Sequence, residues 1–131
     1  MKFGHEQLDV HQLSLEYVAW AYELAKVLKG QNRHARDQLL RASQSIPLNI
    51  AEGNGKGTEN DRRRFFEIAR GSALECRAIQ DVLVVCGVVS DKESDLGKAM
   101  LIRIVWMLTK LGKRTYRVEE APAPYGEIAK S

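Results

Sequence analysis

The chain has few residues that could form a disulfide or bind a metal, because its 131 residues include only two cysteines and three histidines. Cys76 and Cys86 lie on what reads as one helix, where their separation corresponds to roughly 15 Å of rise, so they cannot bridge each other. Neither has a cysteine or histidine nearby at zinc-ligand spacing, and His5, His11 and His34 are scattered over separate segments or lie six residues apart. We therefore expect no metal and no cofactor, and we interpret both cysteines as small core residues.

The chain also lacks a long apolar run and an N-terminal signal sequence. Its longest apolar run, residues 82–89, is far shorter than the ~20 residues that cross a bilayer. The first residues, MKFGHE, lead into a charged amphipathic segment rather than a continuous apolar one. These absences predict a cytoplasmic protein with no membrane partner.

Signatures of enzymatic chemistry are missing as well. We find no nucleophile elbow, no paired catalytic carboxylates and no dinucleotide-binding fingerprint. The glycines of residues 54–59 follow no strand, and their lysine has no Ser or Thr beside it at the spacing of a phosphate-binding loop. We therefore expect a protein that is not an enzyme.

What the chain does contain is helical periodicity, in a composition typical of one globular domain, with 44% hydrophobic and 28% charged residues. Apolar side chains recur three or four residues apart in four segments: residues 9–29, residues 33–53, residues 58–87, and the stretch that follows Ser90. Asp9 is the expected N-cap of the first helix and Thr58 or Asn60 that of the third, and Ser90 with Glu93 forms a capping box for the fourth.

Short links join these helices, and no strand-like alternation competes with them. We predict an all-α fold, an antiparallel up-down-up-down four-helix bundle made by residues 1–114. Residues 115–131 carry no period and are expected to form a flexible tail without chemistry.

The most specific stretch is residues 41–53, a helical pattern with Pro47 in its middle. An interior proline removes one backbone hydrogen bond and costs about 3 kcal/mol, so we expect it to bend the helix. An apolar row that ends at Gly53 is bordered by a polar row on the next stripe round the helix: Arg41, Ser45, Asn49 and Glu52.

We interpret this polar row as a hydrogen-bond and ion-pair network between the second and third helices. A hairpin at residues 54–59 would bring Arg41 to Glu75, and Glu52 to an arginine of residues 62–64. An enzymatic site on the polar row ranks below this interpretation. In the third helix, Gly71, beside Arg70, costs about 1 kcal/mol against alanine, and its expected use is the close approach of a neighbouring helix.

The fourth helix is apolar on nearly all sides. Stripes through Leu96, Leu101 and Ile102 are interrupted only by Lys98, Arg103 and Lys110. A bundle of four helices has only one inside, so a helix that is apolar all round predicts self-association.

Basic residues that are distant in the sequence should converge at one end of this bundle, where the loop between the second and third helices meets the end of the fourth. We call them the basic end: Lys56, Arg62, Arg63, Arg64, Lys110, Lys113 and Arg114. One interpretation is a solvated surface with local ion pairs, since the net charge is only +3. The other is a surface that contacts nucleic-acid backbone without reading sequence. No aromatic platform for base stacking is evident near it.

Three runs carry a resemblance to a known family: LDVHQL at residues 8–13, SIPLNIAEG at residues 45–53, and RFFEIARGS at residues 64–72. Over residues 7–113 the chain resembles the bacterial four-helix-bundle family first noticed as reading frames inside intervening sequences of 23S ribosomal RNA genes. The resemblance implies a homopentamer around a central channel, and a distant kinship with the pentameric accessory protein of diversity-generating retroelements. It implies no established biochemical activity.

These observations support two hypotheses of different classes. The leading one is a non-enzymatic homo-oligomer, pentameric by the resemblance, that binds nucleic acid through the basic end, with structured RNA as the favoured ligand. The alternative is a pentameric scaffold whose partner is another protein and which binds no nucleic acid itself.

Overall fold

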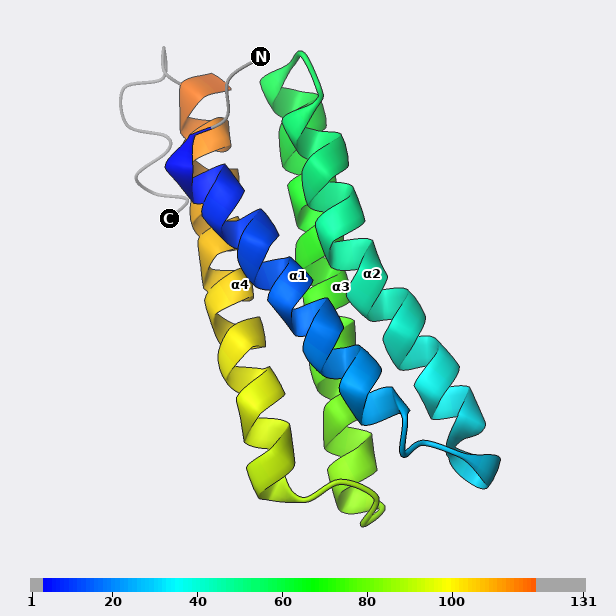
Figure 1. Cartoon of the computed structure of the whole chain (residues 1–131). Coiled ribbons are helices and arrows are strands. Elements are labelled where there is room, and N and C mark those ends of the chain that lie inside the picture. The colour runs from blue at the N-terminus through cyan, green and yellow to red at the C-terminus, as the bar shows by residue number, and fades with distance from the viewer. Residues whose placement is uncertain (1–3, 120–131) are drawn as a thin grey trace.

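The computed structural model describes the backbone of residues 4–119 and the side chains of residues 4–113. Four α-helices, α1 (His5–Ala25), α2 (Arg33–Asn54), α3 (Glu59–Val85) and α4 (Asp91–Glu119), are joined by short connections, one of which contains the 3-10 helix η1 (Gly30–Asn32). Each helix packs antiparallel against the next, and α4 returns to pack on α1 (Figure 1). The predicted all-α four-helix bundle is therefore confirmed. None of the helices within the described residues could cross a membrane.

Two of the predicted helix starts are confirmed by their caps. Thr58 Oγ1 accepts a hydrogen bond of 3.1 Å from the Asp61 backbone amide at the start of α3. Before α4, the Ser90 hydroxyl accepts from the Glu93 amide at 3.1 Å, and the Glu93 carboxylate accepts from the Ser90 amide at the same distance. The capping-box signature thus places the start of the fourth helix correctly.

The predicted bounds of α1 are wrong at both ends. Its N-cap is Gly4 and not Asp9, because Gln7 in the first turn reaches back and accepts from the Gly4 amide at 2.6 Å. Its α-helical part ends at Ala25, where the backbone tightens into a turn in which the Leu28 amide donates to the Ala25 carbonyl at 3.0 Å. Leu28 remains fully buried in this turn, so the apolar period continues beyond the helix.

The fourth helix continues beyond the predicted bundle boundary at residue 114, because residues 115–119 are helical. The remainder of the predicted tail, residues 120–131, lies outside the described residues.

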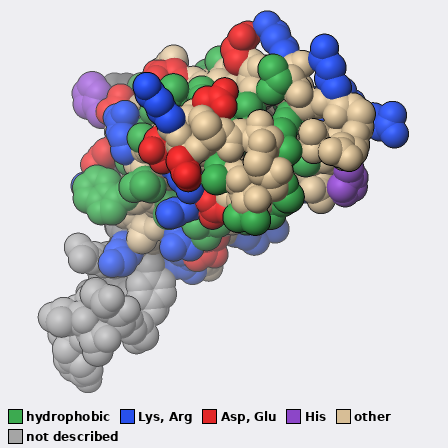
Figure 2. Space-filling view, turned by 90° about the horizontal axis from the view of Figure 1, so that it is seen from below, with side chains coloured by type: hydrophobic (Ala, Val, Ile, Leu, Met, Phe, Trp, Pro, Cys, Tyr) green, Lys and Arg blue, Asp and Glu red, His purple; other side chains and the backbone are tan. Residues whose placement is uncertain are grey.

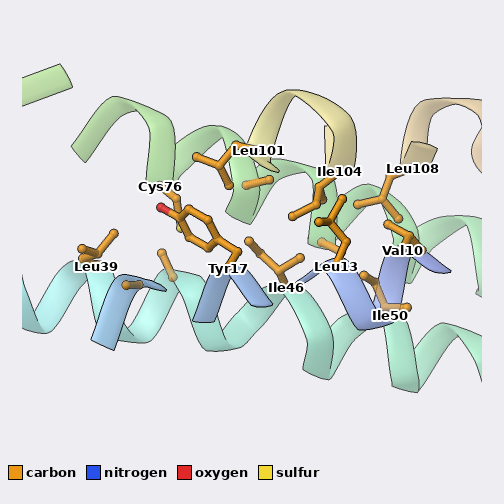
Figure 3. Packing of buried hydrophobic residues seen from close by; sticks show 14 of the residues in the cluster. Val10, Leu13, Tyr17, Leu39, Ile46, Ile50, Cys76, Leu101, Ile104 and Leu108 are labelled. Atoms are coloured by element: carbon orange, nitrogen blue, oxygen red, sulfur yellow. The ribbon is translucent and has the colours of Figure 1, made fainter. Parts of the chain in front are cut away.

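The core lies along the bundle axis and receives one stripe from each helix (Figure 3). The stripes predicted for the first two helices are buried throughout, from Val10 to Leu28 and from Leu39 to Gly53. In α3 the three-four spacing predicts a stripe that starts with Phe65 and Ile68, but the buried residues are Phe66 and Ala69, while Ile68 is 43% exposed. Of the two cysteines, which are both free, Cys76 is buried and Cys86 is exposed beyond the end of α3. The prediction of two core cysteines therefore fails for Cys86.

Close helix packing occurs at Gly53 and Gly97. A Cβ atom added at Gly53 would lie 2.8 Å from the ring of Phe66, and one at Gly97 would lie 2.5 Å from the ring of Trp20. Gly71 is exposed and would place a Cβ atom with nothing within 4 Å. The prediction that Gly71 allows the close approach of a helix is wrong, because it faces outward on α3.

Candidate nucleic-acid interface and the polar row of α2

The polar row of α2 joins that helix to α3, as its pattern predicts. Arg41 pairs with Glu75 at 2.6 Å, and the Ser72 hydroxyl donates to the Ser45 hydroxyl at 2.8 Å. Asn49 stays within α2, where its side-chain amide donates to the Ser45 carbonyl at 2.8 Å.

Glu52 does not follow the prediction. Its ion pair is with Lys56, one turn further along the chain, at 3.3 Å, and Arg62 pairs with Glu59 at 3.2 Å. The predicted pairing of Glu52 with an arginine of residues 62–64 is therefore wrong among the described side chains.

The reason is the register of the α2–α3 hairpin. Gly53 lies level with Phe66, although α2 ends at Asn54 and α3 begins at Glu59. The residues of α3 that precede Phe66 rise about 10 Å along the axis, whereas α2 continues for only one residue past Gly53, so α3 begins about 9 Å, more than one and a half turns, beyond the end of α2. A symmetric hairpin would have placed residues 62–64 beside Glu52, but the observed register carries them past it.

Pro47 lies inside α2 and is buried. The helix is continuous on both sides of it, and the Asn49 amide adds a side-chain donor in the following turn. The bend expected at Pro47 stays a prediction. A shallow hollow of about 540 Å³ over this helix is lined by seven residues of α2 alone, including Arg41, Ser45 and Asn49. No other described element contributes a group to that hollow, which gives the enzymatic reading of the polar row no support.

The structure brings the segments of the basic end to one end of the bundle. The α2–α3 loop and the last turns of α4 both lie at the top of Figure 1. Arg70 Nε donates to Thr109 Oγ1 at 2.8 Å, which fixes the antiparallel register of α3 and α4. In that register Lys113 lies within about 3 Å of Arg64 along the bundle axis, and Lys110 lies about one turn below.

Three of these cations already have partners inside the molecule. Arg62 pairs with Glu59 and also donates to the Lys56 carbonyl oxygen, at 3.3 and 3.4 Å, so it fastens the loop to α3. The Lys56 ammonium pairs with Glu52. Arg63 donates to Asn60 Oδ1 at 2.7 Å.

Arg64, Lys110 and Lys113 are exposed and form no ion pair among the described side chains. The side chain of Arg114 lies outside the described residues. The assignment of these residues to nucleic-acid binding stays a prediction.

Two aromatic rings lie under the cations, and the sequence pattern missed both. The Arg64 guanidinium is 4.8 Å and the Lys56 ammonium 5.1 Å from the centre of the Phe65 ring. Lys110 lies 4.5 Å above the ring of Trp106, which is 62% exposed. The four-residue spacing of Trp106 and Lys110 was the available signal, since such pairs share one face of a helix.

The opposite end of the bundle, formed by the α1–α2 and α3–α4 connections, differs in its charge pattern. Figure 2 views this end and shows acidic side chains among the lysines and arginines. Within the part of the chain that the structure describes, no group of three His, Cys, Asp or Glu side chains could hold a metal ion.

Fold and surface together define an all-α four-helix-bundle protein in which a polar row on α2 fastens the α2–α3 hairpin. Residues 6–110 match the family described as 23S rRNA-intervening sequence protein, and the chain belongs to this family. The family resemblance seen in the sequence is thereby confirmed.

Among solved structures, the chain is similar to a crystal structure of a protein with unknown function from the S23 ribosomal protein family of Bacteroides thetaiotaomicron. The two share 22% sequence identity with a TM-score of 0.77, over 82% of this chain and 98% of that one. At this identity the likeness shows the fold alone. No curated protein matches the chain.

Proposed function

We propose that the protein is a non-enzymatic homo-oligomer that binds structured RNA through its basic end. The observation that carries the proposal is the convergence of exposed Arg64 and Lys113 from helices nearly fifty residues apart, with Lys110 one turn below. Cations in the first turns of a helix oppose its dipole, so helix stability does not account for Arg64. Exposed cations gathered from separate elements are what a phosphate backbone recognises.

The aromatic rings under these cations support RNA over duplex DNA as the ligand. Unpaired bases in RNA loops stack on aromatic side chains, whereas a regular duplex hides its base faces. The Phe65 ring lies 4.8 Å from the Arg64 guanidinium at the basic end, so a base and a neighbouring phosphate could be bound together. The family description refers to 23S rRNA, which is consistent with an RNA ligand.

Self-association is the second part of the proposal. Apolar side chains remain exposed on α4, with Leu96 at 65% and Ile102 at 54%, and single bundles seldom leave several such residues in contact with water. We propose the pentamer that the family resemblance implies. Light scattering should then return five times the chain mass of 14.8 kDa.

Fluorescence anisotropy with a structured RNA hairpin at low ionic strength tests the binding surface. The variant Arg64→Ala/Lys110→Ala/Lys113→Ala should bind at least about 10-fold more weakly than the wild type. Its control, Lys29→Ala/Arg33→Ala/Lys92→Ala, removes the same three charges from exposed positions at the opposite end and should bind like the wild type. Equal binding by both variants would reject the basic end as the binding surface.

A second candidate function is a scaffold for another protein. It is favoured by the internal use of Lys56 and Arg62, which leaves fewer cations for phosphate. A protein partner that stays bound after nuclease treatment and in high salt, together with no RNA binding by the purified chain, would favour this function over the first.

A further inference from the structure

A groove of about 290 Å³ runs between the outer faces of α3 and α4. Leu74 on α3 and Ile102 and Trp106 on α4 form its walls, and each is exposed by more than two fifths of its surface. Arg77 borders the groove on α3. The groove lies below the basic end, since its residues are level with the middle of α3.

A complementary ridge lies on α1. Leu8, Leu15 and Tyr22 recur every seven residues on this helix, and all three are exposed although they are large and apolar. The core stripe of α1 is a different one, which runs from Val10 to Leu24. A second apolar row at heptad spacing is the pattern of a helix that packs against another helix.

The charges beside the ridge and the groove are of opposite sign. The residue after each ridge position is an exposed acid, which gives a row of Asp9, Glu16 and Glu23. Arg77 borders the groove on α3, and Arg70, seven residues earlier and also exposed, donates to Thr109 of the groove wall. Acidic and basic rows that flank an apolar seam select partner and orientation when two helical surfaces pair.

The ridge and the groove lie on opposite sides of the bundle. The extensive packing contacts run between neighbours in the order α1, α2, α3, α4 and back to α1, so the α1–α2 side faces away from the α3–α4 side (Figure 1). One copy cannot place its own ridge in its own groove. A second copy can do so, and the contact then repeats head to tail.

We propose that the groove between α3 and α4 receives the α1 ridge of a second copy of this chain. This inference rests on the self-association in the proposed function and deepens it, because it names the two surfaces that meet. An RNA ligand fits the groove less well, since nucleic-acid interfaces are polar and strongly basic whereas the walls of this groove are apolar.

The test uses the full chain with one glutamate placed on either surface. Leu15→Glu alters the ridge and Ile102→Glu alters the groove, and each should weaken self-association by about 100-fold or more, because an unpaired charge would be buried. Val82→Glu is the control, since Val82 is an exposed apolar residue of α3 outside the groove. Circular dichroism reports whether each variant folds. If Leu15→Glu does not fold, Leu8→Glu replaces it on the ridge, and if Ile102→Glu does not fold, Leu74→Glu replaces it in the groove.

Mixing the two variants gives the decisive result. The Leu15→Glu chain keeps an intact groove and the Ile102→Glu chain keeps an intact ridge, so an equimolar mixture should form a dimer by light scattering although each variant alone is a monomer. Two monomers that stay separate on mixing would overturn the proposed pairing.

Other outcomes separate this inference from the proposed function. If both single variants assemble as the wild type does, the contact between copies lies elsewhere on the surface. That result would reject this inference but not the proposed oligomer. A monomeric wild type would reject both. An Ile102→Glu variant that keeps its assembled mass but loses RNA binding would assign the groove to RNA and overturn the inference.

Discussion

Tyr17 of α1 donates a hydrogen bond of 2.6 Å to the side-chain oxygen of Gln80 on α3, in the buried centre of the bundle. The Gln80 amide nitrogen in turn donates to the hydroxyl and the carbonyl oxygen of Ser94 on α4, at 2.9 and 3.0 Å. One side chain therefore links three helices. Figure 3 shows the Tyr17 ring directed from α1 toward Cys76, one turn before Gln80 on α3.

Gln80→Leu should destabilise the fold by about 2–4 kcal/mol, because it leaves the Tyr17 hydroxyl and the Ser94 hydroxyl buried without their partner. Urea unfolding measures the loss. The double variant Tyr17→Phe/Gln80→Leu should be less destabilised than the sum of the two single variants, since it removes one unsatisfied group. Gln38→Leu, at an exposed position of α2, is the matched control and should change stability by less than about 0.5 kcal/mol.

Alanine should have opposite effects at two glycines of the bundle. Gly97→Ala places a methyl group 2.5 Å from the Trp20 ring and 2.9 Å from Gln80 Oε1, so it should cost about 1–3 kcal/mol. Gly71→Ala meets nothing within 4 Å on an exposed helix face, and it should stabilise the protein by about 0.5–1 kcal/mol. Thermal unfolding distinguishes them, and a destabilised Gly71→Ala would show that the outer face of α3 packs against something.

Arg41→Ala should cost at most about 1 kcal/mol although Arg41 and Glu75 approach to 2.6 Å. The Arg41 side chain is 64% exposed and the Glu75 side chain 41% exposed, so water and salt screen the pair. The double variant Arg41→Ala/Glu75→Ala should show a small coupling energy that declines in high salt. A coupling above about 2 kcal/mol would mean that the pair is buried, as it would be inside an assembly.

Alkaline pH should unfold the protein through the groups around Tyr17. Burial raises the pKa of the Tyr17 hydroxyl well above its usual 10.0, and raises the pKa of the Cys76 thiol from 9.0 to about 12. Both groups keep their protons longer in the folded protein than in the unfolded chain. Their contribution is complete below about pH 9 and is lost as the pH rises toward 12, by about 1.4 kcal/mol per pH unit for each group.

Urea midpoints measured from about pH 8 to about pH 11 test this account. The midpoint should fall steadily above pH 9 for the wild type and less steeply above pH 10 for Tyr17→Phe. Stability that is flat over this range would contradict the burial of the two groups.

The sequence predicted best what depends on regular spacing along one helix. The core stripes of the first two helices and the Ser90–Glu93 capping box follow from intervals of three and four residues, which hold wherever a helix forms. The Arg41–Glu75 pair was also predicted, because long side chains tolerate an error of one turn in the register.

Features that depend on how two helices meet were predicted poorly. The rise of α3 beyond the end of α2 decides whether Glu52 meets an arginine or Lys56, and no local pattern encodes that offset. Gly71 and Gly97 are both single glycines within helices, yet only Gly97 faces another helix. Trp106 and Lys110 lie four residues apart, but Trp106 also continues the apolar stripe through Ile102, and that period alone does not predict the stack with Lys110.

The salt dependence of RNA binding tests the central claim most directly, because phosphate contacts release counterions. The logarithm of the association constant should fall steeply and linearly with the logarithm of salt concentration for the wild type. Losing Arg64, Lys110 and Lys113 should make that slope shallower by about 2, at roughly 0.7 for each contact to a single strand. Binding with the same slope in both proteins, or no binding by the wild type at low ionic strength, would contradict an RNA interface at the basic end.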